Sequence, residues 1–445
     1  MARVASIAAA LAFAAFVVAK GVPTLRHDWN WPIDRLAIPS FFDESVSGWL
    51  SSGFGIANAH PTAYLLALPV VAAMWIFGPL AALALLALAT GYGCMRAAAG
   101  VASRWGNADF AAVGIGLFAL FNPWVYNEVV AGHLTMVLAY GALIGLFSEM
   151  TRGTGACTVR LALWLALVEI QLQFFIIAVL AVALFAAFTR KWSPLLAGAI
   201  VALPSVVGIL AERATLLQIP YSVEWQANQS VDPLSLLSLN GYFPRYADRL
   251  GLGAQVAVWS ICALALVGVV AARRWRTAIW AAAAAALVYL IAIGMRGPLA
   301  APYVWIVRQI PESGVFRELY DLAGVFAALL VVLACAATAS VRALGYVGLA
   351  AGIALSVTWM LHPPSDLWIG ARAYPHPSVT GPAFSRVALL PAFQPLQLRG
   401  GGGDGADPDA FRYPGQVAAL NEYFPTYPVD VALARYEQGG DVSAL

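Results

Sequence analysis

The sequence predicts an all-helical protein that crosses a membrane many times. The chain has 445 residues, of which 61% are hydrophobic and only 11% are charged. A soluble domain carries roughly 25% charged residues, so this composition excludes an ordinary globular protein. The mean hydropathy is +0.77. The apolar residues also form runs that approach the length of about 20 residues needed to cross a bilayer, and neighbouring helices can shelter shorter ones.

Eleven apolar runs are predicted to be transmembrane helices. In chain order they are 3–19, 79–95, 109–123, 134–149, 161–171, 173–189, 194–211, 255–271, 278–294, 321–339 and 345–361. The first run resembles a signal peptide, but its cleavage context is weak and we expect an uncleaved span. A further run, 61–77, lies between His60-Pro61 and Gly78-Pro79. It is either a twelfth span or an interfacial or re-entrant helix.

Loop charge decides between these two interpretations, because Lys and Arg gather in short cytoplasmic loops. If 61–77 does not cross, the cytoplasmic side receives 11 of the 25 basic residues and only two of the 23 acidic ones, Asp109 and Glu149. These basic residues are Arg3, Arg96, Arg104, Arg152, Arg160, Arg190, Lys191, Arg273, Arg274, Arg276 and Arg342. If 61–77 crossed, the later loops would invert. We therefore predict a cytoplasmic N-terminus and an interfacial or re-entrant helix at 61–77.

This topology divides the chain into two domains. Residues 1–361 form the transmembrane domain, whose outer loops are 20–60, 212–254 and 295–320. Residues 362–445 form an extracytoplasmic tail, expected to be a small α/β segment that is either minimal or truncated. Within it, VALL (387–390) before a proline predicts a short strand, and GQVAALNEYF (415–424) predicts a short helix.

The first outer loop holds a group of carboxylates close to the end of the first span. Asp28, Asp34, Asp43 and Glu44 lie within 17 residues. Carboxylates there can act as a general base or hold a divalent cation beside a phosphate. The alternative is that they are solvated loop charges, with nearby tryptophans as interface anchors.

A second polar cluster lies on the outer face between two short spans. It consists of Asn127, Glu128 and His133. A buried carboxylate at this depth is costly unless it is paired or hydrated, so it marks a candidate site. Alternatively, Glu128 is exposed in the loop and His133 caps the next helix. The residues leave these two interpretations open.

A third cluster, VEIQLQFF, forms the turn of the short pair 161–189 and contains Glu169, Gln171 and Gln173. Two spans in 29 residues leave no room for a loop, so we expect this turn to be recessed in the protein. Polar groups at that depth need partners. Hydrogen bonds between helices and contacts to a substrate both explain them.

A fourth cluster, RQIPESGVFRELYDLAG, begins the tenth span and contains Arg308, Arg317, Glu318 and Asp321. The guanidinium of Arg317 suits a phosphate or pyrophosphate headgroup. The alternative is an ion pair of Arg317 with Asp321, four residues further along the helix.

Several function classes find no support in the sequence. Walker A, HExxH, GxSxG and EF-hand patterns are absent, which argues against cytosolic nucleotide use. There is no basic tract for nucleic acid. The four cysteines lack CxxC spacing and are expected to be free thiols.

Three stretches resemble a known superfamily, the GT-C glycosyltransferases. HPTAYLLALPVVAAMWIFGP resembles the segment that follows the acidic loop in that superfamily. NPWVYNEVVAGHLTMVLAYGALIG resembles the GH-led apolar segment of its YfhO-like branch and of related prokaryotic membrane proteins, and SGVFRELYDLAG resembles the segment before a late span. The likeness covers the architecture of residues 1–361.

The resemblance implies an enzyme of a bacterial inner membrane. It would transfer a sugar from a polyprenyl-phosphate-linked donor to an envelope glycan, lipid or protein. In the superfamily a carboxylate of the first outer loop is the base or metal-site residue, which here is Asp28 or, second, Asp34. The loop has no DxD or ExD motif to decide between them. If a divalent cation (Mg²⁺ or Mn²⁺) takes part, Asp28 and Asp34 are its expected ligands.

Eight further residues are expected to contact the substrate. They are His27, His60, Glu128, His133, Glu169, Gln173, Arg317 and Glu318. Two other functions compete with the enzyme. The first is a transporter or flippase of lipid-linked saccharides, which often shows internal repeats and charged residues at the membrane midplane. The second is a non-catalytic assembly subunit that docks through the tail.

Overall fold

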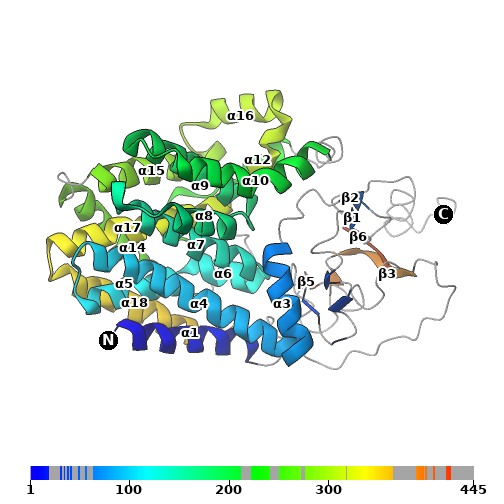
Figure 1. Ribbon diagram of the computed structural model, residues 1–445, viewed down its shortest axis with the longest axis horizontal. Helices are drawn as coiled ribbons and strands as arrows, with labels where there is room; N and C mark the ends of the chain where they lie inside the picture. The colour runs from blue at the N-terminus through cyan, green and yellow to red at the C-terminus, as the bar shows by residue number, and fades with distance from the viewer. Residues whose placement is uncertain are drawn as a thin grey trace.

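The structure is a computed structural model with one large helical bundle. It describes residues 2–19, 64–211, 222–240, 250–271, 276–316 and 318–363, together with short pieces between 31 and 57 and between 387 and 421. Figure 1 shows the long helices running side by side, with the short strands beyond one end of the bundle.

Each of the eleven apolar runs is a helix. Their bounds are α1 (Ala2–Val18), α4 (Pro79–Arg104), α5 (Asp109–Phe121), α7 (Leu134–Met150), α8 (Thr158–Val168), α9 (Leu172–Thr189), α10 (Ser193–Ala211), α14 (Gly251–Ala271), α15 (Arg276–Ala292), α17 (Leu322–Ser340) and α18 (Leu344–Leu361). Most ends agree with the prediction within a few residues. The exception is α4, which continues to Arg104 instead of ending near residue 95.

The chain is a helical membrane protein. In the part of the chain that the structure describes, six helical segments are long and apolar enough to cross a bilayer. They are Pro79–Arg104, Asp109–Ala131, Leu172–Thr189, Gly251–Ala271, Leu319–Ser340 and Leu344–Leu361. The other predicted spans form shorter apolar helices, so the number of crossings remains a prediction.

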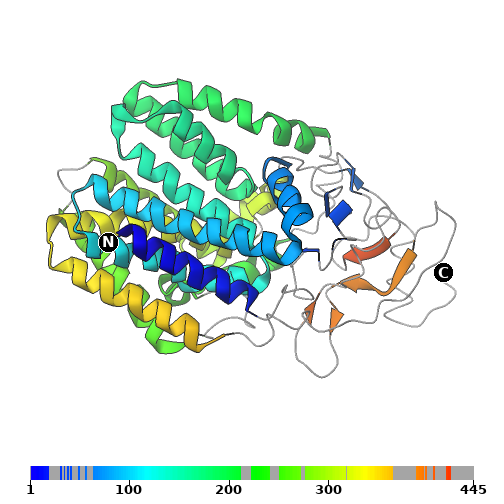
Figure 2. The same cartoon turned by 60° about the horizontal axis from the view of Figure 1, so that its bottom comes forward.

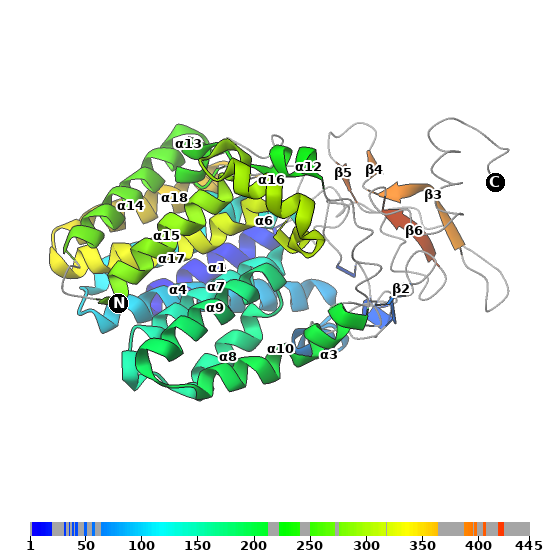
Figure 3. The same ribbon diagram turned by 90° about the horizontal axis from the view of Figure 1, so that it is seen from above.

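Helix α17 is the centre of the bundle. Every residue from Leu322 to Thr338 is buried, and α17 packs against α14, α15, α7 and α5. Figure 3 shows it close to α14 and α15. A helix that is apolar on every face is expected in the interior of a bundle, which is the position of α17.

Helices α5 and α18 approach each other closely because glycines face one another at their contact. A Cβ atom on Gly352 would collide with the carbonyl oxygen of Gly114, and one on Gly345 would lie 2.7 Å from the ring of Phe110. Small residues allow this approach between membrane helices, which gain dispersion contacts over their whole length.

The bundle has two chemically different ends. At the arginine end, formed by residues 104–108, 148–160, 190–192 and 338–343, Asn107 Nδ2 donates to the carbonyl of Cys335 at 3.0 Å and Lys191 Nζ donates to that of Ala156 at 3.4 Å. At the tail end lie the last residues of α1 and α18, the first turn of α17 and α6 (Pro123–Ala131). There the Tyr126 hydroxyl donates to the carbonyl of His362 at 2.7 Å.

Helix α3 (Tyr64–Phe77) lies across the bundle instead of along it (Figures 1 and 2). It packs on the start of α4, and the chain turns between them at Gly78, whose φ of 89° favours glycine. Trp31 Nε1 donates to the carbonyl of Pro79 at 3.0 Å. This orientation favours an interfacial helix over a twelfth span.

The tail contributes short strands. β3 (Val387–Gln394) pairs in parallel with β6 (Val417–Asn421), and β4 (Leu396–Gln397) pairs antiparallel with β5 (Asp404–Gly405). The strand predicted at 387–390 is confirmed. The helix predicted at 415–424 is wrong, because 417–421 form a strand. No helix occurs among the described tail residues, so the α/β class of the tail stays a prediction.

The segments predicted as outer loops contain secondary structure that the sequence analysis did not assign. β1 (Trp49–Leu50) pairs antiparallel with β2 (Ile56–Ala57) in the first loop. The later loops form α12 (Val223–Gln229), α13 (Pro233–Leu237), α16 (Ala300–Gln309) and three 3₁₀ segments, η5 (Gly294–Arg296), η6 (Pro311–Phe316) and η7 (Leu319–Asp321). A last 3₁₀ segment, η3 (Gly153–Gly155), lies between α7 and α8.

Candidate functional site

Helix α6 is the element on which the candidate site is built. The Asn122 side chain caps it by accepting from the Val125 N–H at 3.1 Å, and Pro123 occupies the first helical position. Gly132 ends it in the left-handed region, with a φ of 111°. All nine residues of α6 are buried. The interpretation of this stretch as a loop with an exposed Glu128 is therefore wrong.

Glu128 and His133 form a hydrogen-bonded pair between α6 and α7. His133 Nδ1 lies 2.7 Å from Glu128 Oε2, and the His133 N–H donates to the Glu128 carbonyl at 2.8 Å. The carboxylate is fully buried, whereas 22% of the imidazole is exposed. A buried carboxylate needs such a partner, and the more accessible member of the pair is the histidine.

This pair also corrects the capping interpretation of His133. The residue does occupy the N-cap position of α7, but its side chain makes no capping hydrogen bond. Its Nδ1 is instead directed to Glu128. The imidazole therefore orients the carboxylate and does not serve as a helix cap.

A hydrogen-bond chain joins α6 to the start of α17. Asn127 Nδ2 donates to the Tyr320 hydroxyl at 3.1 Å, and that hydroxyl donates to the carbonyl of Leu239 at 3.2 Å. Asp321 is buried beside Tyr320, and Glu318 is half-buried. Because Arg317 lies outside the described residues, its predicted phosphate contact and its alternative ion pair with Asp321 both stay predictions.

The turn between α8 and α9 is recessed, as the sequence predicted. Glu169 and Gln173 are both buried. Their neighbourhood touches α6 through Trp124, whose ring centroid lies 6.0 Å from that of Phe174. Within the described ranges, Trp124 Nε1 and Gln173 Oε1 have no hydrogen-bond partner. A buried donor and a buried acceptor thus remain unsatisfied on neighbouring elements, which is rare in proteins.

Helix α1, which precedes the predicted first outer loop, packs against the same helix. Phe16, near the end of α1, has its ring centroid 6.2 Å from that of Tyr126, and Trp359 of α18 packs against both rings. The candidates Asp28, Asp34, His27 and His60 lie outside the described residues. Their roles stay predictions.

Helix α6 therefore brings together three of the four sequence clusters, and it also packs against the helix that precedes the first one. Tyr126 meets the end of the span that leads into the first outer loop, and Trp124 meets the helix that carries Gln173. Asn127 bonds to Tyr320, and Glu128 to His133. The sequence analysis placed Asn127 in its cluster but missed Trp124 and Tyr126. An Asn-Pro start and a Gly stop nine residues later could have indicated a short helix here.

Metal binding is predicted only for residues outside the described ranges. Among the described residues there is no group of three His, Cys, Asp or Glu side chains that could hold an ion. Asp28 and Asp34, the expected ligands of a divalent cation, are not among them. The cation therefore stays a prediction that rests on the resemblance.

Comparison with models of known protein families, with curated proteins and with solved structures gives no match for this chain.

Proposed function

We propose that this protein is a membrane glycosyltransferase of the GT-C type. It transfers a sugar from a polyprenyl-phosphate-linked donor to an envelope glycan, lipid or protein. In this proposal all eleven apolar helices cross a bacterial inner membrane, the arginine end faces the cytoplasm, and the reaction occurs at the tail end on the outer face.

The observation that carries the proposal is the position of α6. This buried helix carries Glu128 of the second cluster beside His133, touches the third cluster through Trp124 and bonds to the fourth through Asn127. Its Tyr126 packs against α1, the helix that precedes the first cluster. A transferase for a lipid-linked sugar needs its base, its sugar contacts and its phosphate contacts at one end of an apolar bundle. The contacts of α6 support that convergence.

The unsatisfied groups near α6 suit a sugar. A hydroxyl group both donates and accepts a hydrogen bond, and Trp124 Nε1 offers a donor while Gln173 Oε1 offers an acceptor. The neighbouring aromatic rings provide a flat apolar surface for the C–H face of a pyranose. The Glu128–His133 pair adds a charge-assisted partner for a further hydroxyl.

In the proposed reaction, each bond that forms is matched by a bond that breaks. Asp28, assigned through the resemblance, takes the proton from the acceptor hydroxyl. The acceptor oxygen then forms a bond to C1 of the donor sugar as the bond between C1 and the phosphate oxygen breaks. Polyprenyl phosphate leaves with the electron pair, and Arg317 stabilises the negative charge that develops on it.

The test uses the full chain in liposomes with undecaprenyl phosphate linked to [¹⁴C]glucose, galactose or mannose as separate probes, and an envelope extract as acceptor. We expect label to leave the lipid fraction and undecaprenyl phosphate to be released. Asp28→Asn should lower kcat by about 10²-fold or more, the usual contribution of a general base. His133→Gln should raise KM roughly tenfold, because it removes one charge-assisted hydrogen bond.

His362→Gln is the matched control, because His362 is an exposed histidine at the same end of the bundle. It should keep the parental kinetics. Movement of intact labelled lipid between leaflets without release of undecaprenyl phosphate would instead identify a flippase. An Asp28→Asn protein as fast as the parent would show that the base is another residue.

A further inference from the structure

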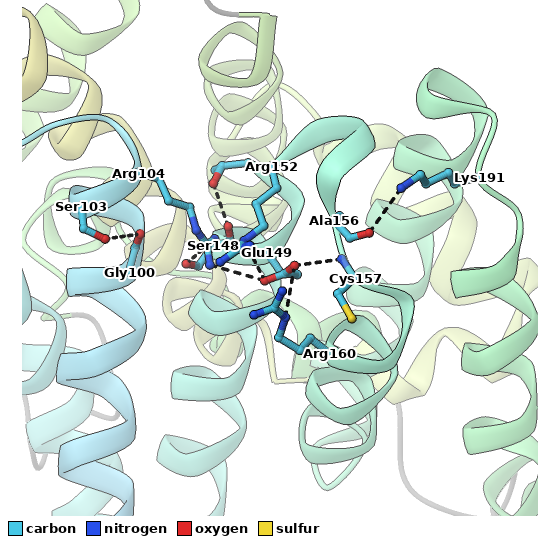
Figure 4. A network of polar contacts seen from close by, with 11 residues as sticks. Gly100, Ser103, Arg104, Ser148, Glu149, Arg152, Ala156, Cys157, Arg160 and Lys191 are labelled. Carbon is cyan, nitrogen blue, oxygen red and sulfur yellow. Dashed lines mark hydrogen bonds and ion pairs between the residues drawn. The ribbon is translucent and has the colours of Figure 1, made fainter.

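Three arginines from different parts of the arginine end meet on one buried carboxylate. Arg104 Nη2 lies 3.4 Å from Glu149 Oε2, Arg152 Nε lies 3.2 Å from the same oxygen, and Arg160 Nε lies 3.5 Å from Oε1. The Cys157 N–H also donates to Oε1 at 2.9 Å. Figure 4 shows these side chains gathered around Glu149. We call Arg104, Arg152, Arg160 and Glu149 the arginine cluster.

The arginine cluster carries a surplus of positive charge. Within the described ranges, Glu149 is the one carboxylate at ion-pair distance from these three arginines. Its contacts with Arg152 and Arg160 are made through Nε, and the Arg160 side chain also interacts with Cys157. The Arg152 and Arg160 side chains are 37% and 50% exposed. They can therefore reach an anion from outside the bundle.

A fourth cation is fixed at the same loop. Lys191 Nζ donates to the carbonyls of Thr154 and Ala156, which precede Cys157 in the turn between α7 and α8. Figure 4 shows Lys191 on the far side of this turn from Arg104. Four cations thus surround this turn, and among the described residues Glu149 is the carboxylate that pairs with its arginines.

An apolar surface begins directly beside these charges. Leu163 lies one turn after Arg160, so both project from the same side of α8, and Val159 and Leu163 are largely exposed. The neighbouring helix α10 joins α8 through a hydrogen bond between Thr158 Oγ1 and Ser193 Oγ at 2.9 Å. It presents the exposed Leu196. The positive charge at the end of α8 suits the phosphate of a phospholipid, and the apolar face beside it suits the acyl chains.

We propose that the arginine cluster binds the headgroup phosphate of an anionic phospholipid, whose acyl chains lie along the exposed faces of α8 and α10. The terminal Nη groups of Arg152 and Arg160 contact the phosphate oxygens, which a guanidinium fits well. Glu149 holds the guanidinium groups together against their mutual repulsion. The site lies at the opposite end of the bundle from the proposed sugar chemistry and does not depend on it.

Native mass spectrometry of the detergent-purified full chain tests the proposal. The probes are dioleoylphosphatidylglycerol, which is anionic, and dioleoylphosphatidylcholine, which has no net charge. Each basic residue near an anionic lipid surface contributes about 1 kcal/mol, or roughly fivefold in affinity. We expect the Arg152→Gln/Arg160→Gln protein to bind phosphatidylglycerol about 30-fold more weakly than the parent, with little change for phosphatidylcholine.

Arg342→Gln is the matched control, because Arg342 is exposed at the same end outside the cluster; it should bind phosphatidylglycerol like the parent. If the double variant does not fold, Arg160→Gln alone should weaken binding about fivefold. A double variant that binds phosphatidylglycerol as tightly as the parent overturns the proposal. So does equal thermal stabilisation by inorganic phosphate, which would indicate a site for soluble phosphate instead of a lipid.

Discussion

The two ends of the bundle hold two buried carboxylates, Glu149 and Glu128, in different ways. At the arginine end, Glu149 is shared by three guanidinium groups and a backbone N–H. At the tail end, Glu128 is hydrogen-bonded to the partly exposed imidazole of His133. Arginine is always charged, whereas histidine changes its charge near neutral pH.

The difference indicates a division of labour. A carboxylate shared by three guanidinium groups and a backbone N–H joins the helix ends and the turn that supply them. A carboxylate bonded to a partly exposed imidazole forms the kind of pair that can move a proton in a reaction. The arginine end is therefore suited to anchoring the protein at a charged surface, and the tail end is suited to chemistry.

The largest expected effect is a difference in protein stability between variants at the two carboxylates. Glu149→Gln leaves three guanidinium groups facing one another and should lower the free energy of unfolding by about 3 kcal/mol. This value already allows for screening at the more exposed arginines. Glu128→Gln should cost only about 1 kcal/mol, because the amide oxygen still accepts from His133. Thermal unfolding in detergent measures both variants.

Salt provides the control for this prediction. The deficit of Glu149→Gln should shrink at 0.5 M salt, because the repulsion among the arginines is screened. The smaller deficit of Glu128→Gln should stay unchanged. Equal losses for both variants at low salt would remove the proposed distinction between the two ends.

A pair of glycine substitutions compares packing at the two ends. A Cβ on Gly324 of α17 would lie 2.6 Å from the Trp124 ring, and one on Gly145 of α7 would lie 2.7 Å from the Trp164 ring. Overpacking costs typically 1–3 kcal/mol, so Gly324→Ala and Gly145→Ala should both lower the unfolding temperature. Only Gly324→Ala displaces α6, and only it should raise KM for the labelled lipid-linked sugar. A kinetic defect in both variants would contradict a site centred on α6.

The apolar runs predicted the helices well because membrane helices depend on length and apolarity, which a sequence displays directly. Helix α6 was missed because its buried Asn127 and Glu128 are typical of a loop. The strand at 417–421 was missed for a different reason. A short apolar run does not show whether it is helix or strand, and its partner β3 begins about 30 residues earlier in the chain.

The sequence predicted the contacts between polar groups less well than it predicted the helices. The contact of His133 with Glu128 is local, and both residues were expected in one cluster. The arginine cluster, by contrast, joins Arg104 to Glu149 across 45 positions. The bond of Asn127 to Tyr320 spans 193 positions. Only the packing of α4 on α7, and of α6 on α17, brings these groups together.

A smaller effect is expected where the proposed sugar site leaves polar groups unsatisfied. Gln173→Leu removes the buried Oε1 that has no partner in the described part of the chain. Loss of such a group should leave the unfolding free energy unchanged or raise it by up to about 1 kcal/mol. Its KM for the lipid-linked sugar should still rise, whereas Gln309→Leu on the exposed end of α16 should keep the parental KM. A clear loss of stability without a change in KM would assign Gln173 to the fold.

The smallest effect, a change in labelling rate at one cysteine, tests which end faces the cytoplasm. Cys94 and Cys335 are buried, whereas Cys157 is partly exposed in the turn at the arginine end. A hydrogen bond from the Arg160 backbone N–H lowers the pKa of the Cys157 thiol from its ordinary value of 9.0. Since the thiolate is the reactive form, its alkylation rate should reach half its maximum below pH 9.0.

Because the thiol of Cys157 should be the most reactive of the four, no cysteine needs to be introduced for this experiment. A membrane-impermeant maleimide at pH 7.5 should label Cys157 in inverted vesicles and leave it unlabelled in right-side-out vesicles, and Cys157→Ser should abolish the signal. The reverse pattern would place the arginine end outside and the Glu128–His133 pair on the cytoplasmic side. A donor presented at the outer face would then be out of reach of that pair, and the proposed sugar transfer would fail with the topology.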